Sequence, residues 1–351
     1  MPKRLVAIKW FLIGSAAALA LTMGQVSATG DLTGLLQVGE NSALRPVIEK
    51  QLGEVHLAPG TGHDGQIYYG IALDPNGTFV PPLIGDEPGY RYRRILFPLI
   101  TSGFGIIDGW PLMYSMVIVN IVSVGIATST VALLAVRGGK SQLWALTVIL
   151  NPGVWLSIFI LTGDALSIAL MLIGITLIVS RRRGAAWAFA GSVLAKDVAI
   201  LTPLGLWSWQ RRRTWWYLAV PSAIIASWVI WTASTMGGAL TARGNLTFPF
   251  FGMMQASSNW TSLPADELLL LGFALLTVLF GLAMAYFAKG PFRWCVLLWS
   301  TVGVMSSNWV WDFGNNAVRV TAPLVILMAL NVIAPPIENA ASDLTEAEVE
   351  L

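Results

Sequence analysis

The first residue with clear chemical potential is an aspartate in a glycine-rich turn. Asp64 stands between Gly62 and Gly65, where the backbone can turn sharply, and residues 66–73 are predicted to form a short helix. The carboxylate would then lie near a helix N-terminus, which favours its charged form, and Tyr68 would share its face. Such a carboxylate suits a general base that deprotonates a sugar or lipid hydroxyl. An ordinary helix cap is the alternative.

A run of arginines and tyrosines follows in the same region. The segment Tyr90-Arg91-Tyr92-Arg93-Arg94 leads directly into an apolar stretch at 95–98. Guanidinium groups bind phosphate oxygens in a bidentate way, and tyrosine rings suit the headgroup layer of a membrane. Interfacial anchoring is the alternative, but it would not explain basic residues on the outer side, where they are disfavoured. We therefore interpret Arg91, Arg93 and Arg94 as binding groups for a phosphate-bearing lipid.

Both segments belong to a chain that is too apolar for a single soluble globule. Charged residues make up 11% of it, against about 25% in typical soluble domains, and hydrophobic residues make up 55%. The 21 basic and 19 acidic residues leave a net charge of +2, which gives no electrostatic footprint for a nucleic acid. One cysteine and two histidines exclude an internal disulfide and the usual zinc spacings. The composition indicates an all-α polytopic membrane protein.

About eight full membrane spans are expected, because a spanning helix needs about 20 apolar residues to cross about 30 Å of hydrocarbon. The candidate spans are residues 5–28, 110–136, 142–161, 165–180, 215–235, 268–287, 294–311 and 320–334. The first segment also fits a cleaved signal peptide, but retention is favoured because removal would leave the following loop without an anchor.

The basic residues orient these spans. Most of them fall on one side if the spans alternate, which predicts cytoplasmic N- and C-termini by the positive-inside rule. Residues 1–351 then form a single integral membrane domain, with residues 29–109 as a large extracytoplasmic loop and residues 335–351 as an acidic cytoplasmic tail. A loop of this length is normally functional or partly folded.

The stretch between Arg183 and Arg211 is too short for two full crossings, yet both flanks are predicted to be cytoplasmic. We expect a pair of short or re-entrant helices with Lys196 and Asp197 at the tip. Irregular backbone at membrane depth is tolerated only inside protein or beside a wet cavity, so this charged pair is a site candidate. The alternative is a single tilted span that buries a self-neutralising Lys–Asp pair.

Two further charged residues lie in predicted outer turns. Asp164 stands between two spans, and Arg319 closes the turn before the last span. Either could contribute to an outer site, and either could be simple loop polarity. We place Asp164, Asp197 and Gln66 as supporting residues.

These motifs resemble bacterial members of the GT-C superfamily of integral membrane glycosyltransferases, similar to the mannosyltransferases of lipid-anchor and protein glycosylation. The resemblance lies in His63-Asp64-Gly65-Gln66-Ile67-Tyr68-Tyr69-Gly70-Ile71-Ala72 and in Tyr90-Arg91-Tyr92-Arg93-Arg94-Ile95-Leu96-Phe97-Pro98. Leu194-Ala195-Lys196-Asp197-Val198-Ala199-Ile200-Leu201 looks like a Leu-x-Lys-Glu-x-Ala-Leu-Leu segment of that family. Thr162-Gly163-Asp164-Ala165-Leu166 looks like its Ser/Thr-Glu-Pro-Leu turn.

The resemblance implies a sugar transfer on the extracytoplasmic side of a bacterial plasma membrane. A polyprenyl-phosphate-linked sugar would be the donor, and a glycan, lipid or protein hydroxyl the acceptor. Asp64 would act as the base for inverting transfer, while Arg91, Arg93, Arg94, Lys196, Arg319 and Tyr68 would bind the substrate and its phosphate. The first loop carries one aspartate at the motif position and not a pair of acids. The motif therefore does not decide whether the transfer needs a divalent cation, Mg²⁺ or Mn²⁺.

Two other functions compete with this one. A transporter or flippase for a lipid-linked or phosphate-bearing substrate would keep ionisable residues near the bilayer midplane and often shows inverted repeats, neither of which the sequence favours. A non-catalytic subunit that binds lipid-linked glycans would not need Asp64 to meet the arginine run or Lys196. A residue that transfers a proton or binds a phosphate must lie within contact distance of its partner. The distances between these residues therefore distinguish a catalytic protein from a subunit that only binds glycans.

Overall fold

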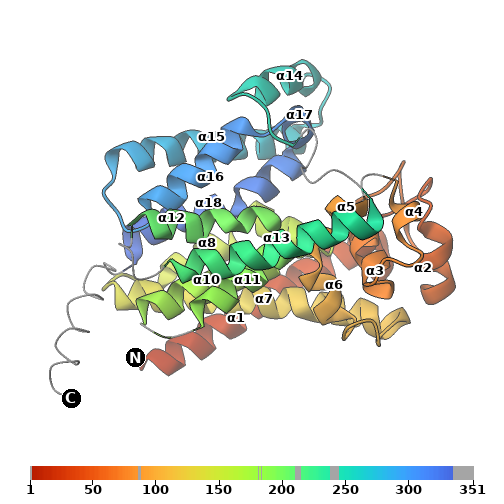
Figure 1. Cartoon of the computed structure of the whole chain (residues 1–351), viewed down its shortest axis with the longest axis horizontal. Helices are drawn as coiled ribbons and strands as arrows, with labels where there is room; N and C mark the ends of the chain where they lie inside the picture. The colour runs from red at the N-terminus through yellow and green to blue at the C-terminus, as the bar shows by residue number, and fades with distance from the viewer. Residues whose placement is uncertain are drawn as a thin grey trace.

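The chain folds into a bundle of long helices with a group of short helices at one end (Figure 1). The structure is a computed structural model that describes residues 2–85, 88–180, 182, 184–209, 215–237 and 245–334. Within these residues the only sheet pairs two short parallel strands, β1 (Val38–Gly39) and β2 (Leu57–Ala58). The expected all-α class is confirmed.

Five helices in the described part of the chain are long and apolar enough to cross a membrane. They are α1 (Lys3–Thr29), α7 (Gly109–Arg137), α13 (Trp216–Met236), α15 (Ala265–Phe287) and α18 (Gly314–Ile333). A sixth span results only if two helical segments bent by 50° at 150–151 count as one. The expected count of about eight is therefore not confirmed.

A polar break explains the bent pair. The expected span 142–161 divides into η3 (Gln142–Ala145), α8 (Leu146–Ile149) and α9 (Pro152–Phe159). The Asn151 side chain accepts the Gly153 N–H at 3.0 Å and donates to the Ala322 carbonyl at 2.9 Å, while Pro152 opens the new helix. Asparagine before proline at a first helical position is a strong start signal, which divides this apolar stretch.

Two other expected spans are too short for a full crossing. The segment 165–180 forms α10 (Asp164–Val179), whose 16 residues cover about 24 Å at 1.5 Å per residue. The segment 294–311 forms α16 (Arg293–Met305) and, after a break, α17 (Asn308–Trp311). Because most of α10 is buried inside the protein, its hydropathy reflects packing against other helices and not lipid exposure alone.

The region around Lys196 forms two short helices, as expected. They are α11 (Ala185–Ala195) and the run of η4 (Asp197–Ile200) with α12 (Leu201–Trp209), and Lys196 itself is extended between them. The alternative of one continuous tilted span is wrong. α11 packs against α10 and α13, whereas α12 packs against α16.

The first loop is folded around a second apolar core, which it shares with residues of α7, α10 and α11. Its helices are η1 (Leu32–Leu36), α2 (Arg45–Leu52), α3 (Asp64–Leu73), α4 (Pro81–Ile84), α5 (Pro88–Arg91), η2 (Tyr92–Arg94) and α6 (Leu96–Thr101). Tyr69, Tyr92 and Phe97 are fully buried in this core. Both oxygens of Asp74 accept backbone N–H groups at 78–80, which fixes the loop between α3 and α4.

The larger core lies among α7, α10, α15, α16 and α18, and α14 (Phe251–Trp260) packs on α17 at the bundle surface. The first loop sits at the end of the bundle where α10 and α18 begin and α11 ends (Figure 1). The predicted tail at 335–351, Arg183 and Arg211 lie outside the described residues.

Candidate functional site

Asp64 is held at the start of α3 by close backbone packing. Gly62 has φ +73°, and a Cβ there would lie 2.3 Å from the Gln37 carbonyl oxygen. A Cβ on Gly65 would lie 2.6 Å from the Ile160 carbonyl oxygen. The two glycines flanking Asp64 are therefore required for α3 to begin this close to neighbouring backbone.

Both oxygens of the Asp64 carboxylate are bound by guanidinium groups. Arg91 Nη1 donates to Oδ1 at 2.9 Å, and Arg319 Nη1 donates to Oδ2 at 2.9 Å. The Asp64 side chain is 20% exposed, so the pair is partly open to solvent. Burial alone would raise the pKa of Asp64, but the positive charges of Arg319, Arg91 and Arg94 outweigh it and hold that pKa well below its ordinary value. Asp64 is thus ionised.

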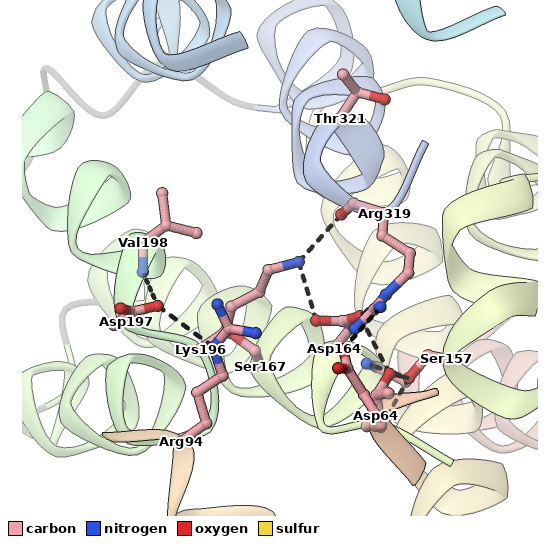
Figure 2. A network of polar contacts seen from close by, with 12 residues as sticks. Asp64, Arg94, Ser157, Asp164, Ser167, Lys196, Asp197, Val198, Arg319 and Thr321 are labelled. Atoms are coloured by element: carbon pink, nitrogen blue, oxygen red, sulfur yellow. Dashed lines mark hydrogen bonds and ion pairs between the residues drawn. The ribbon is translucent and has the colours of Figure 1, made fainter. Parts of the chain in front are cut away.

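Asp164 is the second carboxylate and the more deeply buried one, at 2% exposure. As the first residue of α10, it accepts from Arg319 Nε at 2.8 Å through Oδ2 and contacts Lys196 Nζ at 2.9 Å through Oδ1. Figure 2 shows Arg319 reaching from α18 to the two carboxylates, with Lys196 on the other side of Asp164. One guanidinium therefore joins Asp64 to Asp164.

The turn before α10 fixes the direction of Asp164. Ser157 Oγ donates to the Thr162 carbonyl at 2.8 Å and accepts the Ala165 N–H at 2.9 Å. Thr162 Oγ1 donates to Asp164 Oδ2 at 3.1 Å. The sequence gives no sign that Ser157 belongs to this turn. Thr162 could be predicted, because it stands two positions before Asp164 in a Thr-Gly-Asp sequence.

Lys196 and Asp197 point to different partners. Lys196 Nζ contacts Asp164 and donates to the main-chain oxygen of Arg319 at 3.0 Å, whereas Asp197 Oδ1 lies 3.5 Å from Arg94 Nε. The idea that Lys196 and Asp197 neutralise each other is wrong, because each is paired with a residue of another element.

Tyr90 organises the arginine run. Its hydroxyl oxygen accepts from Arg94 Nη2 at 2.6 Å and from Asn245 Nδ2 at 2.9 Å. The guanidinium carbons of Arg93 and Arg94 stand 5.5 and 5.2 Å from the centre of its ring, within cation–π range. Nothing in the sequence pointed to Asn245, which contacts Tyr90 across 155 positions.

These contacts define an ion-pair cluster in which, among the residues that the structure describes, cations outnumber acids. Its members are Asp64, Arg91, Arg94, Asp164, Lys196, Asp197 and Arg319. Four cations against three carboxylates leave one excess positive charge within this set. Because an uncompensated buried charge is costly, the cluster is suited to accept an anion.

Two predicted residues behave differently from the cluster. The Tyr68 hydroxyl has no hydrogen-bond partner in the described part of the chain, although the side chain is 4% exposed and its ring packs edge-on against Phe97. Gln66 is not at the site: it accepts from the Gly39 N–H and donates to the Thr61 carbonyl, so it supports the loop before Asp64.

An apolar cleft of about 450 Å³ lies between the first residues of α6 and the helices α11 and α13. Ile95, Leu194 and Trp228 line it, and the first two are neighbours in the chain of Arg94 and Lys196. The Trp228 indole donates to the Tyr92 carbonyl at 2.9 Å, which ties α13 to η2 at this cleft.

The carboxylates do not fit a divalent cation. Each oxygen of Asp64 and Asp164 is already bound by a side-chain cation, and the surrounding charge is positive. No group of three metal-ligating side chains occurs among the residues that the structure describes. Mg²⁺ prefers oxygen ligands in an octahedral shell, which this interleaving of acids and cations does not offer.

Comparison of the chain with protein-family models, with curated proteins and with solved structures finds no match in any of the three.

Proposed function

We propose that this protein is an integral membrane glycosyltransferase of the GT-C type, which moves a sugar from a polyprenyl-phosphate donor to an acceptor hydroxyl on the extracytoplasmic side. The observation that carries the proposal is the partly buried, net-positive ion-pair cluster, in which Arg91 and Arg319 bind Asp64, Lys196 binds Asp164 and Arg94 pairs with Asp197, together with an apolar cleft lined by chain neighbours of Arg94 and Lys196. A base, a phosphate-binding set and a place for a lipid tail are the three parts that such a transfer needs.

The cations serve the leaving group. When the bond between the anomeric carbon and the phosphate oxygen breaks, the polyprenyl phosphate leaves with the electron pair and gains a second negative charge. Arg91, Arg94, Lys196 and Arg319 would stabilise that developing charge because they are fixed before the reaction begins. Guanidinium groups match phosphate oxygens geometrically, which suits the arginines to this task.

Asp64 serves the acceptor. Its carboxylate takes the proton of the acceptor hydroxyl, whose oxygen attacks the anomeric carbon from the face opposite the phosphate and inverts the configuration. Arg91 and Arg319 each bind one oxygen of Asp64. Phosphate oxygens compete for the same guanidinium groups, so donor binding would release Asp64 and raise its pKa toward the range of a useful base.

The apolar cleft serves the lipid. Ile95 directly follows Arg94, and Leu194 lies two positions before Lys196, so a phosphate held by these cations would place an isoprenoid chain along the cleft. Burial of such a chain contributes about 0.8 kcal/mol per methylene-sized group, which retains the donor while its sugar faces Asp64.

The test is a transfer assay with the purified full-length protein in lipid vesicles. The substrates are a panel of radiolabelled polyprenyl-phosphate sugars, and the product is labelled glycan, glycolipid or glycopeptide, with donor hydrolysis as a second readout. We expect turnover of at least one donor by the wild type and none by Asp64→Asn. Glu49→Gln, in a partly exposed ion pair with Arg45, is the matched control. Movement of intact donor across the vesicle without product would instead identify a flippase.

A further inference from the structure

The main-chain carbonyl of Arg319 has no regular helical partner. In an α-helix, the carbonyl of one residue accepts the N–H of the residue four positions later. Four positions after Arg319 is Pro323, a proline inside α18 that has no N–H. The carbonyl is therefore left available within an otherwise continuous helix.

Lys196 uses this carbonyl. Its ammonium nitrogen donates to the Arg319 oxygen at 3.0 Å and contacts Asp164 Oδ1 at 2.9 Å, and the side chain is 6% exposed. A buried ammonium has three N–H groups to satisfy, so an acceptor besides the carboxylate fixes its position more tightly than one ion pair would. Figure 2 shows the ammonium between the two acceptors.

We propose that Pro323 is a positioning residue, which leaves the Arg319 carbonyl available to hold the Lys196 ammonium in the cluster. Through the side chain and the main chain of one residue, α18 then places Asp64, Asp164 and Lys196 relative to one another. The effect of Pro323 on donor binding rests on the proposed function, whereas its effect on Lys196 does not.

The variant that tests this is Pro323→Ala, which supplies an N–H that takes one lone pair of the Arg319 carbonyl oxygen and so weakens the hydrogen bond from Lys196. Alanine is also the better helix former, so the variant should unfold at the wild-type temperature or above it. We expect trace acetylation of Lys196 by acetic anhydride, measured by mass spectrometry, to become several-fold faster. We also expect the KM for the donor to rise about tenfold, with a smaller change in kcat.

The matched control is Pro221→Ala on α13. Pro221 is also a buried proline inside a long helix, but the residue four positions before it, Tyr217, is not part of the cluster. This variant should leave both Lys196 acetylation and the donor KM unchanged. Equal changes in the two variants, or no change in Pro323→Ala, would overturn the proposal.

A double variant tests whether Pro323 acts through Lys196. In a Lys196→Met background, Pro323→Ala should no longer alter the donor KM, and a persistent change would show that the proline acts by another route.

A backbone variant covers the case in which Pro323→Ala does not fold. The α-hydroxy analogue of alanine at position 323, which also lacks the N–H, should fold and keep the wild-type acetylation rate. A changed acetylation rate in that analogue also overturns the proposal. Faster acetylation in Pro323→Ala without any transfer by the wild type would retain the role of Pro323 and reject the glycosyltransferase.

Discussion

Arg319 Nη1 lies 2.9 Å from Asp64 Oδ2, although 255 positions separate the two residues in the chain. The contact joins the first loop to the last long helix. Because the same guanidinium also binds Asp164 through Nε, Arg319 is the residue on which the geometry of the cluster depends most.

Replacing Arg319 with methionine should destabilise the protein strongly. The change leaves each carboxylate with one ion-pair partner, Lys196 for Asp164 and Arg91 for Asp64. Breaking a buried ion pair costs about 3–5 kcal/mol. Chemical denaturation in detergent micelles measures the effect. The control is Arg45→Met, which breaks a partly exposed pair within α2 and should cost less than about 1 kcal/mol. Similar losses in the two variants would contradict the central role of Arg319.

Replacing Asp64 with asparagine should remove turnover while leaving the fold. Asparagine has the same shape but cannot accept the acceptor proton, and a positioned base contributes about 10²–10⁴ in rate. Donor-saturated kcat measures the loss, and the affinity for polyprenyl phosphate reports on the cations separately. A variant that keeps more than a tenth of wild-type kcat would show that Asp64 is not the base.

The stability of the protein should fall in acid partly through Asp64. Its pKa is lowered from the ordinary value of 3.8 in the folded state, so the ion pairs stabilise the protein above that value. As the pH falls below 3.8, the unfolded chain binds a proton before the folded one does, and the contribution declines. Thermal unfolding from pH 3 to pH 6 should therefore show the gap between wild type and Asp64→Asn narrowing below about pH 4. A gap independent of pH would contradict the assignment.

Tyr68→Phe should separate stability from substrate binding. The Tyr68 hydroxyl is buried without a hydrogen-bond partner among the described residues, so its removal should leave the unfolding temperature unchanged or slightly higher. If the hydroxyl binds the donor, the KM should rise several-fold. Tyr69→Phe is the comparison, since that hydroxyl donates to the Gly109 carbonyl and its loss should lower stability instead.

Chelation should not affect transfer. Both carboxylates are occupied by side-chain cations, so we expect the same rate with EDTA, with Mg²⁺ and with Mn²⁺. Loss of activity in EDTA that added Mg²⁺ restores would show that a cation displaces one of these ion pairs during turnover.

The sequence predicted the long helices well and the short ones poorly. Hydropathy alone identifies α1, α7, α13, α15 and α18, because an uninterrupted apolar run of about 20 residues is typical of a membrane-spanning helix. It overestimates the spans at α10, α16 and the bent pair, since burial inside protein produces the same apolar composition. Asn151-Pro152 is a local signal for a helix start, but the apolar stretch around it is long enough to be interpreted as one uninterrupted span.

The sequence predicts which residues form the site better than it predicts which of them contact one another. Asp64, Arg91, Arg94 and Lys196 stand out in the sequence because charge is scarce in this chain, and each of them takes part in an ion pair of the cluster. The sequence indicates only a supporting role for Asp164, since nothing near it in the chain shows that Arg319 and Lys196 converge on it. Such pairings are decided by helix packing over more than a hundred positions, which no local spacing encodes.

The arrangement of the cluster has a consequence for biosynthesis. Chains are made from the N-terminus, so Asp64 emerges from the ribosome long before Arg319 does. Until α18 has been synthesised and inserted, the cation that joins the two carboxylates is absent and Lys196 lacks its carbonyl acceptor. A partly made chain therefore lacks the complete ion-pair cluster, and on the proposed function it could not yet transfer sugar from a lipid-linked donor.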